Sequence, residues 1–181
     1  MPRYFIGLDL DPSSKLVIQD WREKRLHGLP DKPVPAENYH LTLSFLGDLT
    51  PRQYEMTVAK LQDIAVKSFQ CQVSHIGAFI KPQILYLGVN DNPNLLQLAE
   101  QCRNINAAVG VKQHHSQYIP HITITRKHKN AVPLTIEAPV LNLKFSQFHL
   151  FESVSSHEKG KPPHYPIRET FELIPQFSHK E

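Results

Sequence analysis

Two short stretches with the same pattern decide how this chain folds: His-Leu-Thr-Leu at residues 40–43 and His-Ile-Thr-Ile at residues 121–124. On an extended strand, successive side chains point to opposite faces. The histidine and the threonine of each stretch therefore share one face, and the two aliphatic residues share the other. Each stretch predicts a strand with an apolar back in the core and an imidazole beside a hydroxyl in front. Two such strands in one chain predict a site with two facing histidines.

Alternation, turn residues and cap signals around these stretches indicate the remaining elements. The motif strands are predicted at residues 39–46 and 118–125, and further strands at 4–10, 69–80, 84–89, 141–152 and 164–174. Three helices are predicted where a capping side chain precedes a proline, at Asp11-Pro12, Thr50-Pro51 and Asn92-Pro93. This element order predicts an α+β fold with mostly antiparallel pairing. On the first helix we expect a buried side formed by Leu16, Val17, Trp21 and Leu26.

Composition and length limit the class of protein. Hydrophobic residues make up 40% of the 181 residues and charged residues 20%, which indicates a folded chain with a real core rather than a disordered one. No linker or low-complexity segment divides it, so we expect a single domain over residues 1–181, made of two interleaved lobes with one motif each. The formal net charge of +3 is compatible with a phosphate-bearing ligand but supports it only weakly.

Cysteine use and hydropathy bear on the compartment. Cys71 and Cys102 form no CxxC pair, and we expect reduced thiols of a cytosolic protein, with a lone disulfide as the alternative. The N-terminal stretch lacks the long apolar core and cleavage site of a signal peptide. No run approaches the roughly 18 apolar residues of a membrane span. We therefore expect a cytoplasmic protein that does not enter the membrane.

Paired histidines suit proton transfer. The pKa of a free imidazole lies closest to neutral pH, so one copy can act as a base while another acts as an acid. Placed on opposite sides of a phosphodiester, one imidazole would take a proton from water and the other would give one to the leaving oxygen. A neighbouring threonine hydroxyl can donate a hydrogen bond to a phosphate oxygen. A single motif of this kind would most often be structural; two matching motifs favour a site.

The motifs and their surroundings resemble a known superfamily. NYHLTLSFLGDL at residues 38–49 and PHITITRK at residues 120–127 are similar to the paired HxTx signatures of the two-histidine (2H) phosphoesterases, and closest to the LigT-like RNA 2′,3′-cyclic phosphodiesterases. Residues 5–12 and 150–153 add to the likeness, which therefore spans nearly the whole chain. The resemblance implies a bilobal, pseudo-twofold fold in which two mostly antiparallel sheets line a central cleft and helices lie outside.

The resemblance also implies an activity and roles for the motif residues. The expected reaction is metal-independent hydrolysis of RNA 2′,3′-cyclic phosphate ends to 2′-phosphates by a monomer that needs no cofactor. His40 is implied as the proton donor to the 3′ oxygen and His121 as the proton acceptor from water, although the two roles could be exchanged. Thr42 and Thr123 are implied as phosphate-binding residues. Small 2′-5′ or cyclic nucleotides, and tRNA fragments, remain open as substrates.

Two further positions are implied by the resemblance: Arg126 as a phosphate contact and Phe45 as the packing surface for a nucleobase. Each lies five residues after its histidine, so a regular strand would turn it away from the site. Both reach the site only if each strand bends, bulges or ends first. Core packing is the alternative for Phe45.

Two other functions stay open for these motifs. The same site could serve reversible 2′-5′ RNA ligation acting on tRNA halves, or it could bind RNA ends without turnover. A metal site could draw on His114, His115 and His121, but their spacing matches no zinc signature and no neighbouring Cys or carboxylate completes a set, so no metal is expected. Residues 127–129, Lys-His-Lys, are expected to form a solvated loop that could guide an RNA backbone.

Overall fold

Most of the predicted elements are present in the computed structural model, which describes residues 1–29, 31–112, 117–129 and 136–176. The helices are α1 (Pro12–Arg25), α2 (Pro51–Gln62), α3 (Pro93–Ala108) and a short 3₁₀ helix, η1 (Ala36–Asn38). The strands are β1 (Arg3–Asp9), β2 (Lys32–Pro33), β3 (His40–Asp48), β4 (Phe69–Phe79), β5 (Ile84–Val89), β6 (His121–Arg126), β7 (Asn142–Phe145), β8 (Gln147–Ser153) and β9 (Ile167–Glu172).

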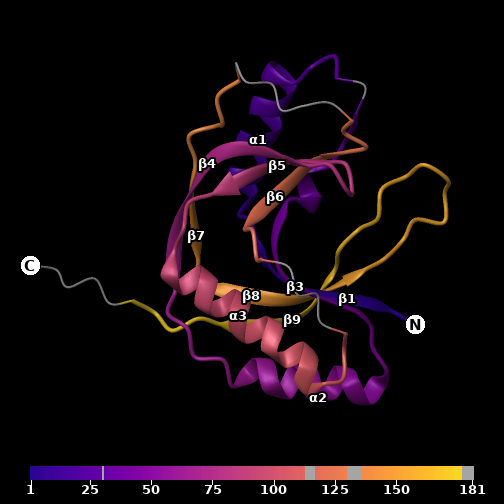
Figure 1. The fold of residues 1–181 in the computed structure, drawn as a ribbon, viewed down its shortest axis with the longest axis vertical. Coiled ribbons are helices and arrows are strands. Elements are labelled where there is room, and N and C mark those ends of the chain that lie inside the picture. Colours follow the sequence, from indigo (N-terminus) through magenta and orange to yellow (C-terminus); the bar gives the residue numbers. More distant parts are fainter. Residues whose placement is uncertain (30, 113–116, 130–135, 177–181) are drawn as a thin grey trace, which may run out of the picture.

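The strands pair in the order β7-β4-β5-β6-β3-β1-β8-β9, with β2 alongside β6 (Figure 1). The named strands pair antiparallel, which confirms the α+β class. The two sheets expected from the resemblance are joined into one, because the motif strands β3 and β6 meet through the pair Leu41↔Ile122. A second junction lies at Ser146, since β7 before it pairs with β4 and β8 after it pairs with β1. The motif strands therefore form the seam between the two halves.

The helices begin where the cap signals predicted. The Asp11 carboxylate accepts the Ser14 amide at 2.7 Å, Thr50 forms a capping box with Gln53, and the Asn92 side chain accepts two amides of the first turn of α3. α3 packs against β3 and α2, and α2 against β9, so both cover the half that holds β1, β3, β8 and β9 (Figure 1). No helix of the described residues is long and apolar enough to cross a membrane.

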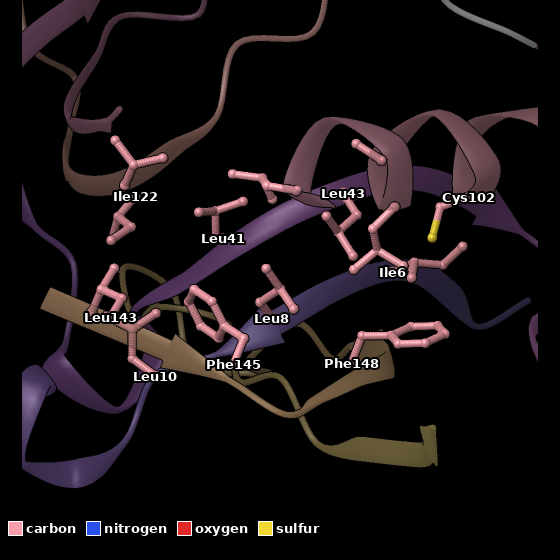
Figure 2. Close-up of a cluster of buried hydrophobic side chains, with 14 of the residues drawn as sticks. Ile6, Leu8, Leu10, Leu41, Leu43, Cys102, Ile122, Leu143, Phe145 and Phe148 are labelled. Carbon is pink, nitrogen blue, oxygen red and sulfur yellow. The ribbon is translucent and has the colours of Figure 1, made fainter. Parts of the chain in front are cut away.

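The apolar backs of both motif strands lie in one core. Leu41, Leu43, Ile122 and Ile124 are at most 1% exposed. Figure 2 shows Leu41, Leu43 and Ile122 gathered with side chains of β1, β7 and β8, among them Leu8, Leu143 and Phe148. Full burial of one such side chain is worth about 1.5–3 kcal/mol. This burial fixes which face of each strand carries the histidine.

Several local predictions need correction. On the first helix, Leu26 is buried and Trp21 packs against the core as expected, but Leu16 and Val17 are exposed, and Ser14 and Ile18 of α1 are buried instead. The last strand covers only Ile167–Glu172, because His164 instead pairs as an isolated bridge with Val154. The prediction of a solvated loop at residues 127–129 is wrong for its central residue, His128.

His128, that central residue, is 3% exposed, and its Nδ1 lies 2.5 Å from the carboxylate of Asp31, which is itself buried. The pair ties the end of β6 to the segment just before β2. Cys71 and Cys102 are both free and buried in the core, which confirms the expectation of reduced thiols.

Candidate active site

A β-bulge in β3 returns Phe45 to the face of His40. Along β1, Gly7 pairs with Thr42 and the adjacent Ile6 pairs with Ser44, so Leu43 is the extra residue of the bulge. Leu43 and Ser44 consequently both point into the core, at 1% and 5% exposure. Phe45 then faces outward and is 62% exposed, which excludes core packing as its role.

A matching bulge lies in β6. Along β5, Tyr86 pairs with Thr123 and the adjacent Leu85 with Thr125, which makes Ile124 the extra residue. Ile124 and Thr125 are buried and Arg126 is exposed, so both motif strands show the same burial pattern over their first six residues. In both halves, therefore, a bulge turns the residue five places after the histidine to the same face as the histidine.

The antiparallel register brings the two motifs together on one face. The pairing of Leu41 with Ile122 places His40 toward Thr123, and Thr42 toward His121, across the seam. The side chains of Leu41 and Ile122 point into the core, so the two histidines and two threonines lie on the opposite face. The structure thus brings all four motif residues together.

The His40 imidazole is held on both nitrogens. Its Nδ1 lies 2.7 Å from the carbonyl oxygen of Asn38, which can only accept, so Nδ1 carries a proton. Its Nε2 lies 3.0 Å from the Thr42 hydroxyl. The ring packs against Phe5 at 4.8 Å between centroids. Nε2 is therefore the nitrogen free to exchange a proton.

The His121 imidazole is oriented by an equivalent contact. Its Nδ1 lies 2.7 Å from the carbonyl oxygen of Ile119, again two residues before the histidine. Its ring contacts Phe79 and Tyr86, with centroids 5.0 Å and 5.3 Å away. Here too Nε2 is left without the proton when the ring is neutral, and it is the nitrogen that can accept one.

Both imidazoles are harder to protonate than a free histidine. The pKa of His40 is lowered from 6.5 to about 4, mainly by burial and also by the positive charges of Arg126 and His121. The hydrogen bond to Asn38 and the negative charge of Asp9 act in the opposite direction and raise it. Burial also lowers the pKa of His121, while the hydrogen bond to Ile119 raises it. The action of Arg126 and His121 on His40 shows that the two halves of the site share one electrostatic environment.

A groove of about 560 Å³ adjoins His40, and its lining includes Phe45, Arg126 and Tyr165. Tyr165 was not anticipated from sequence, where it fell in the last predicted strand. It lies near the end of the loop between β8 and β9, which extends away from the sheet (Figure 1). Its ring meets His40 edge-on at 5.2 Å, and its hydroxyl accepts a hydrogen bond from Arg126 at 3.4 Å. Tyr165 thus links a residue of each half.

Among the residues that the structure describes, no set of metal ligands gathers around these histidines. His114 and His115 lie outside the described residues. Within the part of the chain that the structure describes, no group of three or more His, Cys, Asp or Glu side chains could hold a metal ion.

Comparison with known proteins finds relatives over most of the chain. The family model described as the 2′-5′ RNA ligase superfamily matches residues 10–155. The chain is 28% identical over 167 residues to an RNA 2′,3′-cyclic phosphodiesterase of Escherichia coli (92% of this chain, 94% of the relative). It is 30% identical over 131 residues to an enzyme of the same name from Aquifex aeolicus (68% of this chain, 70% of the relative).

Solved structures give the same result. The E. coli LigT structure complexed with 3′-AMP superposes with a TM-score of 0.87 at 27% identity, covering 96% of this chain and 99% of that one. A structure described as a phosphoesterase gives a TM-score of 0.86 at 27% identity and covers 98% of that chain.

An open, mostly antiparallel sheet with two HxTx strands at its seam defines the phosphoesterase class that the sequence resembled. The chain belongs to the 2′-5′ RNA ligase superfamily. Within it, the relatives named above are RNA 2′,3′-cyclic phosphodiesterases.

Proposed function

We propose that this chain is an RNA 2′,3′-cyclic phosphodiesterase that opens cyclic phosphate ends to 2′-phosphates without a metal ion. The observation that supports the proposal is that both imidazoles are held by the same kind of hydrogen bond. Each donates its Nδ1 proton to a backbone carbonyl two residues earlier, and each therefore presents Nε2 for proton transfer. Relatives over most of the chain's length bear the name of this activity.

In the proposed reaction, a water oxygen attacks phosphorus while His121 Nε2 takes a proton from that water. The bond between phosphorus and the 3′ oxygen breaks, and His40 Nε2–H gives its proton to that oxygen. The products are a 2′-phosphate and a free 3′ hydroxyl. His40 ends neutral and His121 protonated, and exchange with solvent restores both.

The threonines and Arg126 would stabilise the charge that develops on the phosphate. Thr42 and Thr123 flank the histidines and can donate hydroxyl protons to its non-bridging oxygens. Arg126, exposed on the same face, would add a charge-assisted contact. Phe45, exposed in the groove beside His40, offers a flat apolar face to the terminal nucleobase.

The acid role of His40 requires the substrate. With a pKa of about 4, His40 is neutral in the free protein near neutral pH. A bound phosphate brings negative charge next to the imidazole and offsets the positive charge of Arg126, and both effects raise the pKa of His40. The exchanged assignment, with His40 as the base, needs no such rise.

The first test is turnover of an oligonucleotide with a 2′,3′-cyclic phosphate end in the presence of EDTA. Wild-type protein should retain its activity, and His40→Ala and His121→Ala should each lose at least about 100-fold, the usual contribution of one general acid or base. Loss of wild-type activity in EDTA, or unchanged turnover in both folded variants, contradicts the proposal. Phosphorus NMR of the product should show a 2′-phosphate.

A second test assigns the roles. In a substrate whose 3′ oxygen is replaced by sulfur, the leaving thiolate needs no proton. The variant that lacks the acid should then recover most of its activity, whereas the variant that lacks the base should not. Recovery by His121→Ala in place of His40→Ala would exchange the two roles.

Ligation is the second candidate, favoured by the description of the matching family. In the same site, a 5′ hydroxyl of a second RNA would replace water as the nucleophile and form a 2′-5′ bond. Ligation of cleaved tRNA halves, assayed beside hydrolysis at equal enzyme concentration, ranks the two reactions. A faster ligation than hydrolysis would make joining the main activity.

A further inference from the structure

A buried asparagine on α3 contacts the bulge that turns Phe45 into the groove. Asn106 is 5% exposed and sits in the apolar face of the helix, close to the buried Ile105 and Val109. A buried amide is costly unless its hydrogen bonds are made. The Asn106 amide therefore needs hydrogen-bond partners in the core.

Both ends of the Asn106 amide bind β3 at the bulge. Its Nδ2 donates to the backbone carbonyl of Phe45 at 3.0 Å, and its Oδ1 accepts the hydroxyl of Ser44 at 3.2 Å. Ser44 is the residue that the bulge directs into the core. The amide thus fixes the two successive residues at which the strand changes from facing inward to facing outward.

The second motif strand is held differently, which makes the Asn106 contact specific to Phe45. At the equivalent place in β6, Thr125 pairs with Pro33 and Arg126 with Lys32 of the short strand β2. The Thr125 hydroxyl is buried and has no hydrogen-bond partner among the described residues. Both bulges are paired along one edge, with β1 or with β5, but their other edges differ. The other edge beside Arg126 pairs with the backbone of β2, whereas the other edge beside Phe45 is contacted by the Asn106 side chain.

We propose that Asn106 is a positioning residue for nucleobase binding: by holding the β3 bulge, it keeps Phe45 exposed in the groove. Asn106 lies on the core side of the sheet, away from the substrate, and acts only through Phe45. It is predicted to affect how tightly a base-bearing substrate binds and to leave proton transfer at His40 and His121 unchanged. This inference rests on the proposed function for its kinetic readout.

The kinetic test is a double-mutant cycle with Asn106→Leu and Phe45→Ala, using a substrate with a terminal base and one with an abasic ribose 2′,3′-cyclic phosphate. Asn106→Leu should raise KM about 5- to 10-fold for the base-bearing substrate, within the range of base–aromatic stacking, with kcat little changed. The abasic substrate should show no such rise, and in the Phe45→Ala background the second change should add nothing. Additive losses, or equal losses on both substrates, overturn the proposal.

Two variants control for general damage to the fold. Asn104→Leu makes the same chemical change at an exposed position of the same helix and should leave KM unchanged. Ser44→Ala removes only one of the two Asn106 contacts and keeps the one to the Phe45 carbonyl, so its rise in KM should be smaller than that of Asn106→Leu. An equal effect of Asn104→Leu contradicts a specific role for Asn106.

A readout without substrate separates this inference from the proposed function. In protein carrying Phe45→Trp and Trp21→Phe, the indole at position 45 reports its own exposure through quenching by acrylamide. Adding Asn106→Leu should change the quenching constant, and adding Asn104→Leu should not. If wild-type protein turns over no cyclic phosphate but Asn106→Leu alters quenching, the proposed function fails and the positioning role stands. Unchanged quenching overturns the positioning role.

Discussion

At the scale of single residues, the two site histidines share their orientation but not their surroundings. Both rings are anchored through Nδ1 to a carbonyl two residues earlier. In addition, His40 Nε2 contacts the Thr42 hydroxyl, and the positive charge of Arg126 lowers the pKa of His40. This difference makes the pKa of His40 the property most sensitive to an anionic ligand.

Inorganic phosphate should therefore raise the pKa of His40 above its free value of about 4. The added negative charge favours the imidazolium form. Phosphate binding is therefore accompanied by proton uptake at pH values between the pKa of His40 without phosphate and its pKa with phosphate. The measurement is the Cε1–H chemical shift of His40 against pH, with and without phosphate, with chloride at equal ionic strength as the control. A titration unaffected by saturating phosphate would show that the phosphate binds elsewhere.

Tyr165 gives a second prediction at this scale. Tyr165→Phe keeps the edge contact with His40 but removes the hydroxyl that accepts from Arg126. Because that hydrogen bond is long, we expect KM to rise only about 2- to 5-fold, in keeping with a net bond of under about 1 kcal/mol. Tyr165→Leu also removes the ring from beside His40 and should lower kcat as well. Equal kinetics for both variants and wild type would exclude a role for this side chain.

At the scale of elements, the bulge is the feature that brings the fifth residue after each histidine to the face of that histidine. Without it, the residue five places after the histidine would face the core, where a guanidinium would lack the anionic partner that its burial requires. With it, the same six-residue pattern of burial arises twice and delivers an aromatic side chain in one half and a cation in the other.

Two glycines, Gly77 on β4 and Gly88 on β5, allow a test of how rigidly the Tyr86 ring beside His121 is packed. A Cβ at Gly77 would overlap the Tyr86 ring, which is 8% exposed, stacks on Phe79 and contacts His121. The atoms nearest to a Cβ at Gly88 belong to the ring of His75, which is exposed.

Gly77→Ala should therefore destabilise the fold by about 1–3 kcal/mol, as overpacking does, and lower kcat by shifting His121. Gly88→Ala should be nearly neutral in both respects. Urea denaturation and steady-state kinetics of the two variants provide the comparison. If the two substitutions cost the same, the Tyr86 ring is not held as rigidly as its contacts indicate.

At the scale of the whole molecule, the site lies on the seam where the two halves of the sheet join. Its histidines are consequently half-buried between the halves, and folding lowers the pKa of both. His149, buried in β8, is shifted in the same direction by burial. For each of these groups, the unfolded chain binds protons more readily than the folded chain.

The fold should therefore lose stability on acidification. A lowered histidine pKa costs nothing above the unfolded value of 6.5, and the cost grows as pH falls from there to the folded value, about 4 for His40. For His40 alone the full cost is at most about 3.5 kcal/mol. The free energy of unfolding in urea should fall more steeply over this window for wild type than for His40→Asn. Identical slopes would show that His40 does not titrate differently on folding.

How far the site could be predicted differs from residue to residue. His40, Thr42, His121 and Thr123 are placed by strand alternation alone, since their faces follow from the apolar residues between them. Tyr165 has no such signal, because its contacts cross from the loop after β8 to both motif strands. The buried face of α1 was only partly predicted: Trp21 and Leu26 lie against the core, but Ser14 and Ile18 are buried in place of Leu16 and Val17.

The sequence by itself determined the paired motif strands, the helix starts and the α+β class, because alternation and capping are local and need no knowledge of neighbours. Only the tertiary structure decided that both strands bulge after their third residue, that the two halves join at Leu41 and Ile122, and that Asn106 contacts the bulge beside Phe45. Bulges, registers and buried hydrogen bonds depend on which strand or helix lies alongside. Which elements lie side by side depends on how well the whole core packs, and that cannot be read from any short stretch of the chain.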